Sequence, residues 1–392
     1  MKFAQRLSNL QASIFSQLAE LKMDVERSGH SLINLSIGSP DLAPSAEVRK
    51  VISEHSLHDH AYSYTLTRGS SEFREACAKW YKIRFDVDLD PDTEVLPVMG
   101  SQDGLSHIFW AFIDHGDAAL IPDPGYPIYS DGLALVQGRK IPLPLKEDNC
   151  FLPDFSSINP EDAAQAKLMI LNYPNNPTAA VASKSFFEET VEFAAKHGIV
   201  VCHDAAYTEL AYDGYVPASF LQAEGAREVG VEFHSLSKTF NLAGIRLGFV
   251  VGNANVIKAL ETIKSNIDYG TFSPILKAGA AALLGSRNTI LGNQETYKKR
   301  RDIWVDGCAA AGWHMLRPKG SMFVWAPVPT GQDSVSFVFE LAREAGVLVV
   351  PGIAFGEYGE GYVRVGLVQN EEALEEAVYR VRNFLCQKRT IK

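Results

Sequence analysis

The chain has 392 residues, of which 46% are hydrophobic and 21% are charged, and its formal net charge is −10. A chain of this length is expected to form two domains, and its negative charge disfavours nucleic acid and anionic lipid as partners. No apolar run approaches the ~20 residues that span a bilayer, and residues 1–6 lack the pattern of a secretory signal, so we expect a cytoplasmic protein without a membrane role.

The cysteines argue against a disulfide framework and against a zinc site. There are five of them, widely scattered and never spaced as C-x-x-C. Structural disulfides and zinc sites need paired or closely spaced cysteines. We therefore expect reduced thiols and no metal.

Between residues 94 and 285, short apolar runs alternate with longer amphipathic segments. Strands are predicted at residues 94–99, 118–122, 167–172, 199–203, 231–235 and 249–252, with helices such as residues 101–113 and 183–197 between most of them. This alternation is typical of an α/β fold, in which helices flank a mostly parallel sheet. Several polar motifs directly follow these strands, at the edge where open α/β sheets bind ligands.

The pattern changes after residue 285, where a smaller α+β domain is predicted. It comprises helices at residues 288–311, 334–344 and 371–386 and strands at residues 322–327, 347–350 and 362–368. Because chain ends often pack together, we assign residues 1–45 to this small domain with residues 285–392. Residues 46–284 then form the large domain.

A lysine and an arginine follow the strand that ends at Ser235. In the string Ser-Leu-Ser-Lys-Thr-Phe-Asn-Leu-Ala-Gly-Ile-Arg-Leu-Gly they are Lys238 and Arg246. A lysine beside a buried strand is partly desolvated, which lowers its pKa toward the range in which the neutral amine is a nucleophile. The guanidinium of Arg246 suits a phosphate, which it can bind through two hydrogen bonds.

A turn at Gly100, between a predicted strand and a predicted helix, also favours an anion. The helix N-terminus at Ser101 and Gln102 presents free backbone N–H groups and the positive end of the helix dipole. Taken alone, this turn has a simpler explanation, because serine and aspartate, here Ser101 and Asp103, commonly cap helices.

Together these strings resemble the motifs of the class I/II aminotransferases, which are fold-type I enzymes of the aspartate aminotransferase superfamily and depend on pyridoxal 5'-phosphate (PLP). The resemblance covers residues 34–368. The strings Tyr-Pro-Asn-Asn-Pro-Thr and Asp-Ala-Ala-Tyr are more loosely similar to LL-diaminopimelate, alanine and methionine-related aminotransferases. The resemblance implies an enzyme that moves an amino group between an L-amino acid and a 2-oxo acid by a ping-pong mechanism.

Three catalytic residues are implied by the resemblance. Lys238 forms a Schiff base with PLP and moves the α-proton of the substrate. Asp204, at a strand end, keeps the pyridine nitrogen protonated, and Tyr207 donates a hydrogen bond to the 3′ oxygen of the ring. The other residues implied in PLP binding are Ser101, Gln102, Tyr126, Asn176, Ser235 and Arg246.

The resemblance also assigns substrate and subunit contacts. Arg364 binds the α-carboxylate, with Gly38 and Asn176 beside it. Tyr64 is expected to reach the phosphate in the neighbouring subunit, which implies a homodimer with shared active sites. The family commonly has glycine where this chain has Ala179, and alanine would be strained if that turn needs a positive φ.

Strict aspartate specificity is disfavoured. Residues 265–272 contain no arginine for a side-chain carboxylate, and the position in the Gly100 turn where some relatives have lysine is Gln102. Two alternatives to an aminotransferase remain. A PLP-dependent C–S β-lyase would use the same fold, lysine and aspartate. A PLP-binding regulator would need a DNA-binding module ahead of the first motif, where this chain has about 30 residues.

Two clusters of basic residues have simple explanations. The histidines at positions 55, 58 and 60 lie in a polar connection, for which we expect a solvated loop and no metal. The run of lysines and arginines at positions 298–301 is expected to form a solvent-facing stripe on a charged helix.

Overall fold

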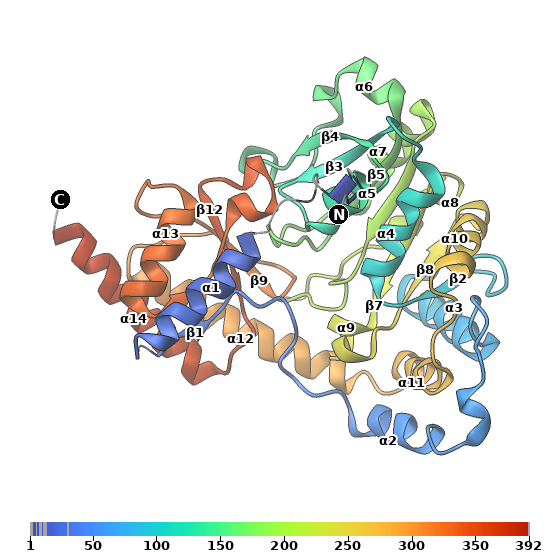
Figure 1. Ribbon diagram of the computed structural model, residues 1–392, viewed down its shortest axis with the longest axis horizontal. Coiled ribbons are helices and arrows are strands. Elements are labelled where there is room, and N and C mark those ends of the chain that lie inside the picture. The colour runs from blue at the N-terminus through green and yellow to red at the C-terminus, as the bar shows by residue number, and fades with distance from the viewer. Residues whose placement is uncertain (1–2, 5, 8–9, 11–13, 30, 391–392) are drawn as a thin grey trace.

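The computed structural model describes residues 3–4, 6–7, 10, 14–29 and 31–390 (Figure 1). The cyan, green and yellow parts of the chain form a sheet with its helices on the right of Figure 1, and the dark blue helix α1 (Ile14–Arg27) lies on the left together with the orange-to-red end. Met1, Lys2 and Gln5, on which the prediction about a secretory signal partly depends, lie outside the described residues. Within the described part of the chain, no helix combines the length and apolar character needed to cross a bilayer.

The larger sheet has the strand order β2-β8-β7-β6-β5-β3-β4. Its strands are β2 (Val95–Val98), β3 (Ala118–Asp123), β4 (Arg139–Pro144), β5 (Ala166–Asn172), β6 (Val200–Asp204), β7 (Gly230–Ser235) and β8 (Gly248–Gly252). Strand β8 runs antiparallel to both its neighbours, β2 and β7, and the remaining neighbours are parallel. The predicted α/β fold with a mostly parallel sheet is therefore confirmed.

Helices pack on both faces of this sheet because successive strand residues point to opposite faces. Leu120 and Ile121 of β3, for example, belong to two different hydrophobic clusters. The helices in the Ile121 cluster are α4 (Ser101–Phe112), α5 (Ile128–Leu135) and α10 (Ala254–Ile267), and those in the Leu120 cluster include α3 (Ser71–Phe85), α7 (Lys184–His197) and α11 (Ser273–Leu284). The other helices of this part of the chain are α2 (Ala46–His55), α6 (Pro160–Gln165), α8 (Ala226–Val229) and α9 (Leu236–Thr239).

The two ends of the chain share a third hydrophobic cluster. Leu18 and Leu21 from the N-terminal helix belong to it together with Trp304 and Phe384 from the C-terminal part. The helices here are α1 (Ile14–Arg27), α12 (Asn288–Ala310), α13 (Ser334–Glu340) and α14 (Glu371–Thr390). The antiparallel sheet β11-β12-β9 consists of β11 (Val350–Pro351), β12 (Tyr362–Gly366) and β9 (Phe323–Pro327), and β1 (Ile33–Asn34) pairs in parallel with β10 (Val347–Leu348).

Three elements differ from the sequence predictions. Strand β4 was not predicted, because Pro142 and Pro144 interrupt its pattern, and prolines are tolerated in this strand because it lies at the sheet edge. The strand expected at residues 347–350 is two strands, since β10 pairs with β1 whereas β11 pairs with β12. The helix expected at residues 334–344 ends as α13 at Glu340, and one π-helical turn follows.

The prediction of a solvent-facing basic stripe on α12 is wrong for two of its four residues. Arg300 and Arg301 are only 3% and 1% exposed, because they lie on the same buried side of the helix as Trp304. Arg300 donates to both carboxylate oxygens of Asp41, at 2.7 and 2.8 Å, and Arg301 pairs with Asp213. Buried guanidinium groups need such partners, and the periodicity of one helix does not reveal them.

Candidate active site

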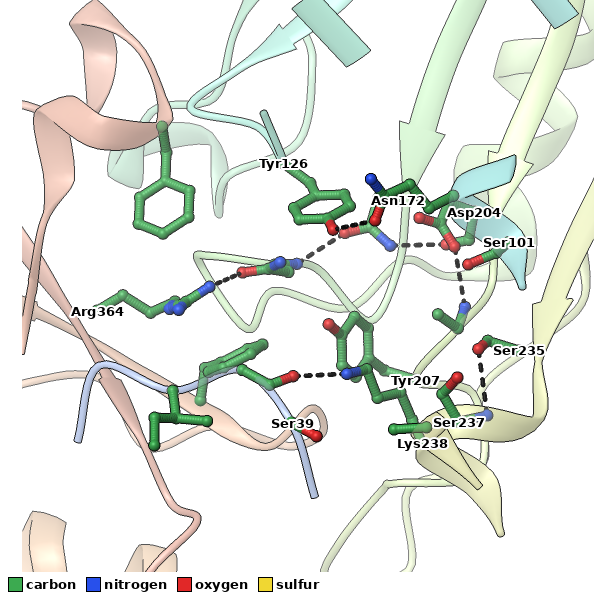
Figure 2. Close-up of a pocket in the computed structure, with 18 of the residues that line it drawn as sticks. Ser39, Ser101, Tyr126, Asn172, Asp204, Tyr207, Ser235, Ser237, Lys238 and Arg364 are labelled. Carbon is green, nitrogen blue, oxygen red and sulfur yellow. Dashed lines mark hydrogen bonds between the residues drawn. The ribbon is translucent and has the colours of Figure 1, made fainter. Parts of the chain in front are cut away.

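A cavity of about 590 Å³ opens at the carboxyl ends of β5, β6 and β7, where the small antiparallel sheet faces the large one (Figure 2). Segments far apart in the chain contribute to its lining, and Figure 2 shows Asp204, Lys238 and Arg364 pointing into the same space. Eleven of the predicted site residues line it: Gly38, Ser101, Gln102, Tyr126, Asn176, Asp204, Tyr207, Ser235, Lys238, Arg246 and Arg364. Tyr64 is the exception, with a side chain that is 94% exposed outside the cavity.

Lys238 lies on the short helix α9, directly after β7. Ser235 caps this helix by accepting a hydrogen bond from the backbone N–H of Ser237 at 3.2 Å. The Nζ of Lys238 donates to the backbone oxygen of Gly38 at 2.5 Å. Burial, followed by the positive charges of Arg364 and Arg246, lowers the pKa of Lys238 to about 8. A substantial fraction of this lysine is therefore a neutral, nucleophilic amine near physiological pH.

Asp204 ends β6 and is 4% exposed. Its Oδ2 accepts a hydrogen bond from the Tyr129 hydroxyl at 2.7 Å, and its Oδ1 accepts one from the backbone N–H of Ala206 at 3.2 Å. Burial raises the pKa of this carboxyl group, and the hydrogen bond from Tyr129 opposes the rise. No ion pair joins Asp204 to another described residue. A protonated ring nitrogen would supply the positive partner that a buried carboxylate needs.

Two residues of this cluster were not predicted as site residues. Tyr129 lies in the string Asp-Pro-Gly-Tyr-Pro-Ile-Tyr (residues 123–129), three residues after the predicted site residue Tyr126. Asn172 ends β5 and donates from Nδ2 to the backbone oxygen of Asp204 at 2.7 Å. Its place at a strand end beside the cavity was the signal that could have identified it.

The other end of the cavity has the features of a phosphate site. Helix α4 begins here, and its first backbone N–H groups lack partners within the helix. Gly100 has φ +84°, and a Cβ built on it would lie 2.7 Å from Nη2 of Arg246. Glycine is therefore required for the guanidinium to approach the helix start this closely. The hydroxyl groups of Ser101 and Ser235 line the same cavity. These donors suit the phosphate of PLP.

Tyr126 and Tyr207 supply aromatic surface between these two ends. The Tyr126 hydroxyl donates to Oε1 of Gln102 at 3.0 Å, so Gln102 contacts this tyrosine within the protein. The buried ring of Tyr207 lies edge-on to Phe323, at a centroid distance of 5.7 Å. Burial, together with the charge of Asp204, raises the pKa of Tyr207, which therefore stays protonated and able to donate a hydrogen bond.

Arg364 projects from β12 and is 4% exposed. Its Nη1 donates to Oδ1 of Asn176 at 2.9 Å, its Nη2 donates to the backbone oxygen of Ser36 at 3.0 Å, and its Nε has no partner among the described residues. It forms no ion pair with a described carboxylate, and burial lowers its pKa to about 10. A buried guanidinium with an unused N–H group is suited to bind the carboxylate of a ligand.

The turn that carries Asn176 takes the conformation that alanine disfavours. Ala179 has φ +57°. Asn175 stabilises this turn, because its Oδ1 accepts hydrogen bonds from the backbone N–H and the hydroxyl of Thr178, both at 2.9 Å. Side-chain hydrogen bonds therefore hold a backbone geometry that a glycine would adopt without strain.

Comparison with known proteins decides the family. A family model described as "Aminotransferase class I and II" matches residues 30–381. The chain belongs to this family. LL-diaminopimelate aminotransferases from Desulforudis audaxviator and Moorella thermoacetica are 44% and 45% identical to it, and the matches cover 97% of both chains in the first case and 98% of this chain and 99% of the relative in the second.

Solved structures agree with this membership. This chain is similar to the structure of substrate-bound BacF from Bacillus subtilis. The two have a TM-score of 0.94 and 37% sequence identity, and the match covers 98% of each chain. A probable N-succinyldiaminopimelate aminotransferase from Thermus thermophilus has a TM-score of 0.90 and 37% identity, over 95% of this chain and 100% of its own.

The protein is thus an aminotransferase, an enzyme that uses PLP and converts amino acids and 2-oxo acids into one another. The prediction of a fold-type I enzyme of this class is confirmed. The β-lyase and regulator alternatives are not favoured, because relatives that match nearly the whole chain are named as aminotransferases.

Proposed function

We propose that this aminotransferase uses Lys238, Asp204 and Tyr207 as catalytic residues and Arg364 as its anchor for the substrate α-carboxylate. One observation carries the proposal: Arg364 is buried without a carboxylate partner among the described residues, in the same cavity as the partly neutral Lys238. An amino acid bound to Arg364 presents its amine and its α carbon toward the lysine.

The side chains of the protein have separate roles in this reaction. PLP, when bound, withdraws electrons from the bond to the α-proton. Lys238 Nζ acts first as a general base, which takes the proton from the α carbon of the substrate, and then as a general acid, which gives the proton back at a different atom. Asp204 holds a positive charge at the ring nitrogen, and the hydroxyl of Tyr207 donates to the ring 3′ oxygen. Asn176 orients Arg364 through the 2.9 Å hydrogen bond.

The remaining predicted contacts are part of the same proposal. Tyr126 stacks on the cofactor ring, with Gln102 holding the tyrosine hydroxyl. Gly38 contacts the substrate, because it lines the cavity beside the guanidinium of Arg364. The phosphate is bound by Ser101, Ser235 and Arg246.

For the amino donor we propose an amino acid whose side chain carries no net charge. Among the described residues that line the cavity, the cationic ones are Lys238, Arg246 and Arg364, and each already has a role toward PLP or the α-carboxylate. An acidic side chain would be buried without a cation. LL-diaminopimelate is the first candidate, because relatives that match nearly the whole chain are named for it. Its side chain ends in an ammonium group and a carboxylate group, whose opposite charges give a net charge of zero.

A specific observation favours a second class of donor, amino acids with apolar side chains. Phe15, Ile37 and Phe355 line the cavity, and Phe355 lies against the guanidinium of Arg364. Apolar walls stabilise an apolar side chain through burial. A panel of LL-diaminopimelate, L-phenylalanine, L-leucine, L-methionine, L-aspartate and L-glutamate, each followed by absorbance for conversion of bound PLP to its amino form, decides between these classes. Faster conversion with L-aspartate or L-glutamate than with every neutral donor would refute the proposal.

The oligomer we propose is a homodimer in which Tyr64 reaches the phosphate site of the partner. Support comes from the exposure of Tyr64, at 94%, and from its edge-on contact with Tyr269, itself 45% exposed, at a centroid distance of 6.0 Å. Mixing Lys238→Ala chains with Tyr64→Ala chains tests it. In a shared-site dimer, each mixed pair has one intact site, so random mixing restores about one quarter of wild-type activity. No recovery would contradict shared sites.

The domain bounds and the cellular location are also proposals. We propose residues 46–284 as a large domain and residues 1–45 with 285–392 as a small domain. Two hydrophobic clusters support the division: one has its members between residues 48 and 290, and the other consists mainly of residues from 18–35 and 297–385. The second cluster also contains residues of the proposed large domain, namely Leu145, Phe151, Ala206, Tyr207, Leu210 and Tyr212. A cytoplasmic location stays a prediction of the sequence.

A further inference from the structure

A buried carboxylate joins the two parts of the chain that enclose the cavity. Asp123 ends β3 and is 3% exposed. Its Oδ1 accepts a hydrogen bond from the backbone N–H of Tyr358 at 3.0 Å, and its Oδ2 accepts one from Nζ of Lys140 at 2.8 Å. Tyr358 belongs to a turn formed by the 3-10 helices η8 (Gly352–Phe355) and η9 (Glu357–Gly359). Asp123 therefore links the large sheet to a turn of the C-terminal part.

The turn fits closely onto this carboxylate. Gly356 has φ +134°, and a Cβ built on it would lie 2.0 Å from Oδ1 of Asp123. Two residues after Asp123, the backbone N–H of Gly125 donates to the backbone oxygen of Phe355 at 2.8 Å. We call the hydrogen bonds Asp123–Tyr358 and Gly125–Phe355 the β3 clasp.

The residue that the clasp holds is a wall of the active site. Phe355 lines the cavity, and its ring centroid lies 4.8 Å from Cζ of Arg364. On another side, the ring lies edge-on to Phe15, with the centroids 6.2 Å apart. Tyr126, which follows Gly125, lines the same cavity. The clasp thus fixes Phe355 relative to Tyr126 and limits the space beside Arg364.

We propose that Asp123 is a positioning residue that determines substrate selectivity: through the β3 clasp it holds Phe355 beside Arg364 and so sets the room left for the substrate side chain. The inference rests on the proposed function in one respect, the binding of the α-carboxylate by Arg364. The clasp includes neither α9 nor the start of α4, where Lys238, Ser235 and Ser101 lie. Of the residues assigned to PLP it adjoins only Tyr126, whose hydroxyl is held separately by Gln102, so we expect PLP affinity to stay unchanged when Asp123 is replaced.

The test compares Asp123→Asn, Phe355→Leu and the double variant in the PLP-loaded enzyme. Asparagine has one oxygen in place of two, so either the Tyr358 N–H or Lys140 Nζ then faces an NH2 group and loses its acceptor. The matched control is Asp117→Asn, which removes the same charge just before the other end of β3, where Asp117 pairs with Lys167 at 2.5 Å. For the best donor of the panel and for L-alanine, kcat and KM are measured, and PLP affinity is titrated by absorbance. We expect Asp123→Asn and Phe355→Leu each to raise the KM of the best donor about tenfold and to leave its kcat within about twofold of the wild-type value. The ratio of kcat/KM for the best donor to kcat/KM for L-alanine should therefore decrease.

Because Asp123 acts through Phe355, the double variant should equal Phe355→Leu rather than show the product of both effects. Asp117→Asn and the PLP affinities should match the wild type. An unchanged KM in Asp123→Asn, multiplicative effects in the double variant, or a loss of PLP affinity as large as the change in KM would each overturn the inference. If Asp123→Asn does not fold, Lys140→Met, which removes the other partner of the carboxylate, carries the same expectation. Arg364→Met separates the two proposals: if it leaves KM unchanged, the proposed function fails, whereas an effect in Arg364→Met without one in Asp123→Asn refutes only the role of Asp123.

Discussion

Replacing Arg364 by methionine tests the substrate anchor directly. The guanidinium is 4% exposed, so its hydrogen bonds to a substrate carboxylate form away from water. A hydrogen bond to a charged group contributes ~1.5–3 kcal/mol, and the planar fork of arginine offers two of them to one carboxylate. The loss is then about 3–6 kcal/mol, which lowers kcat/KM roughly 10²–10⁴-fold for any amino acid donor.

The assay is the half-reaction with saturating PLP, followed by the absorbance change of the cofactor at several donor concentrations. Arg364→Lys is the matched variant, since it keeps the positive charge and loses the fork, and its kcat/KM should lie between those of the wild type and the methionine variant. Urea unfolding of each variant controls for lost stability, because Asn176 and Ser36 lose their buried donor. A decrease below fivefold in a folded Arg364→Met enzyme would refute the reasoning.

Three more predictions concern pH and stability. Because burial lowers the pKa of Lys238 to about 8, capture of added PLP by the PLP-free chain should accelerate with pH and level off above that value, and a rate still rising at pH 10 would point to an ordinary lysine. Burial alone would raise the pKa of Glu232, but hydrogen bonds from His203 at 2.9 Å and His234 at 2.8 Å outweigh it and hold the pKa well below its usual range. A carboxylate with a depressed pKa stabilises the folded chain above its unfolded pKa of ~4.3, and this contribution decreases as the pH falls toward the folded pKa. Glu232→Gln should therefore cost about 3–5 kcal/mol in urea unfolding at pH 7 and less near pH 3, and equal losses at both pH values would contradict this. Ala179→Gly should raise the free energy of unfolding by about 0.5–1 kcal/mol, because the φ of +57° strains alanine more than glycine loses in chain entropy, and any destabilisation would argue against strain there.

Local patterns in the sequence determined much of the fold and the centre of the site. The alternation of apolar runs and amphipathic segments predicts the strands of the large sheet within a residue or two, apart from β4. Because parallel strands end at one edge, polar residues just after them meet there, which is why Asp204, Asn176 and Lys238 could be predicted to share a cavity. Arg364 was predicted from the family resemblance, and its burial in strand β12 fits that prediction because a buried arginine needs a ligand or a partner.

Tertiary packing decided what those patterns could not contain. Tyr129 reaches Asp204 from a helix 75 residues earlier in the chain, and Phe15 and Phe355 meet at the cavity from opposite ends of the sequence. The burial of Arg300 likewise depends on tertiary packing, because its partner Asp41 lies 259 residues away in the sequence. The physical reason is the same in each case: propensity and periodicity are properties of neighbouring residues, whereas a side-chain contact depends on how separate elements pack against each other.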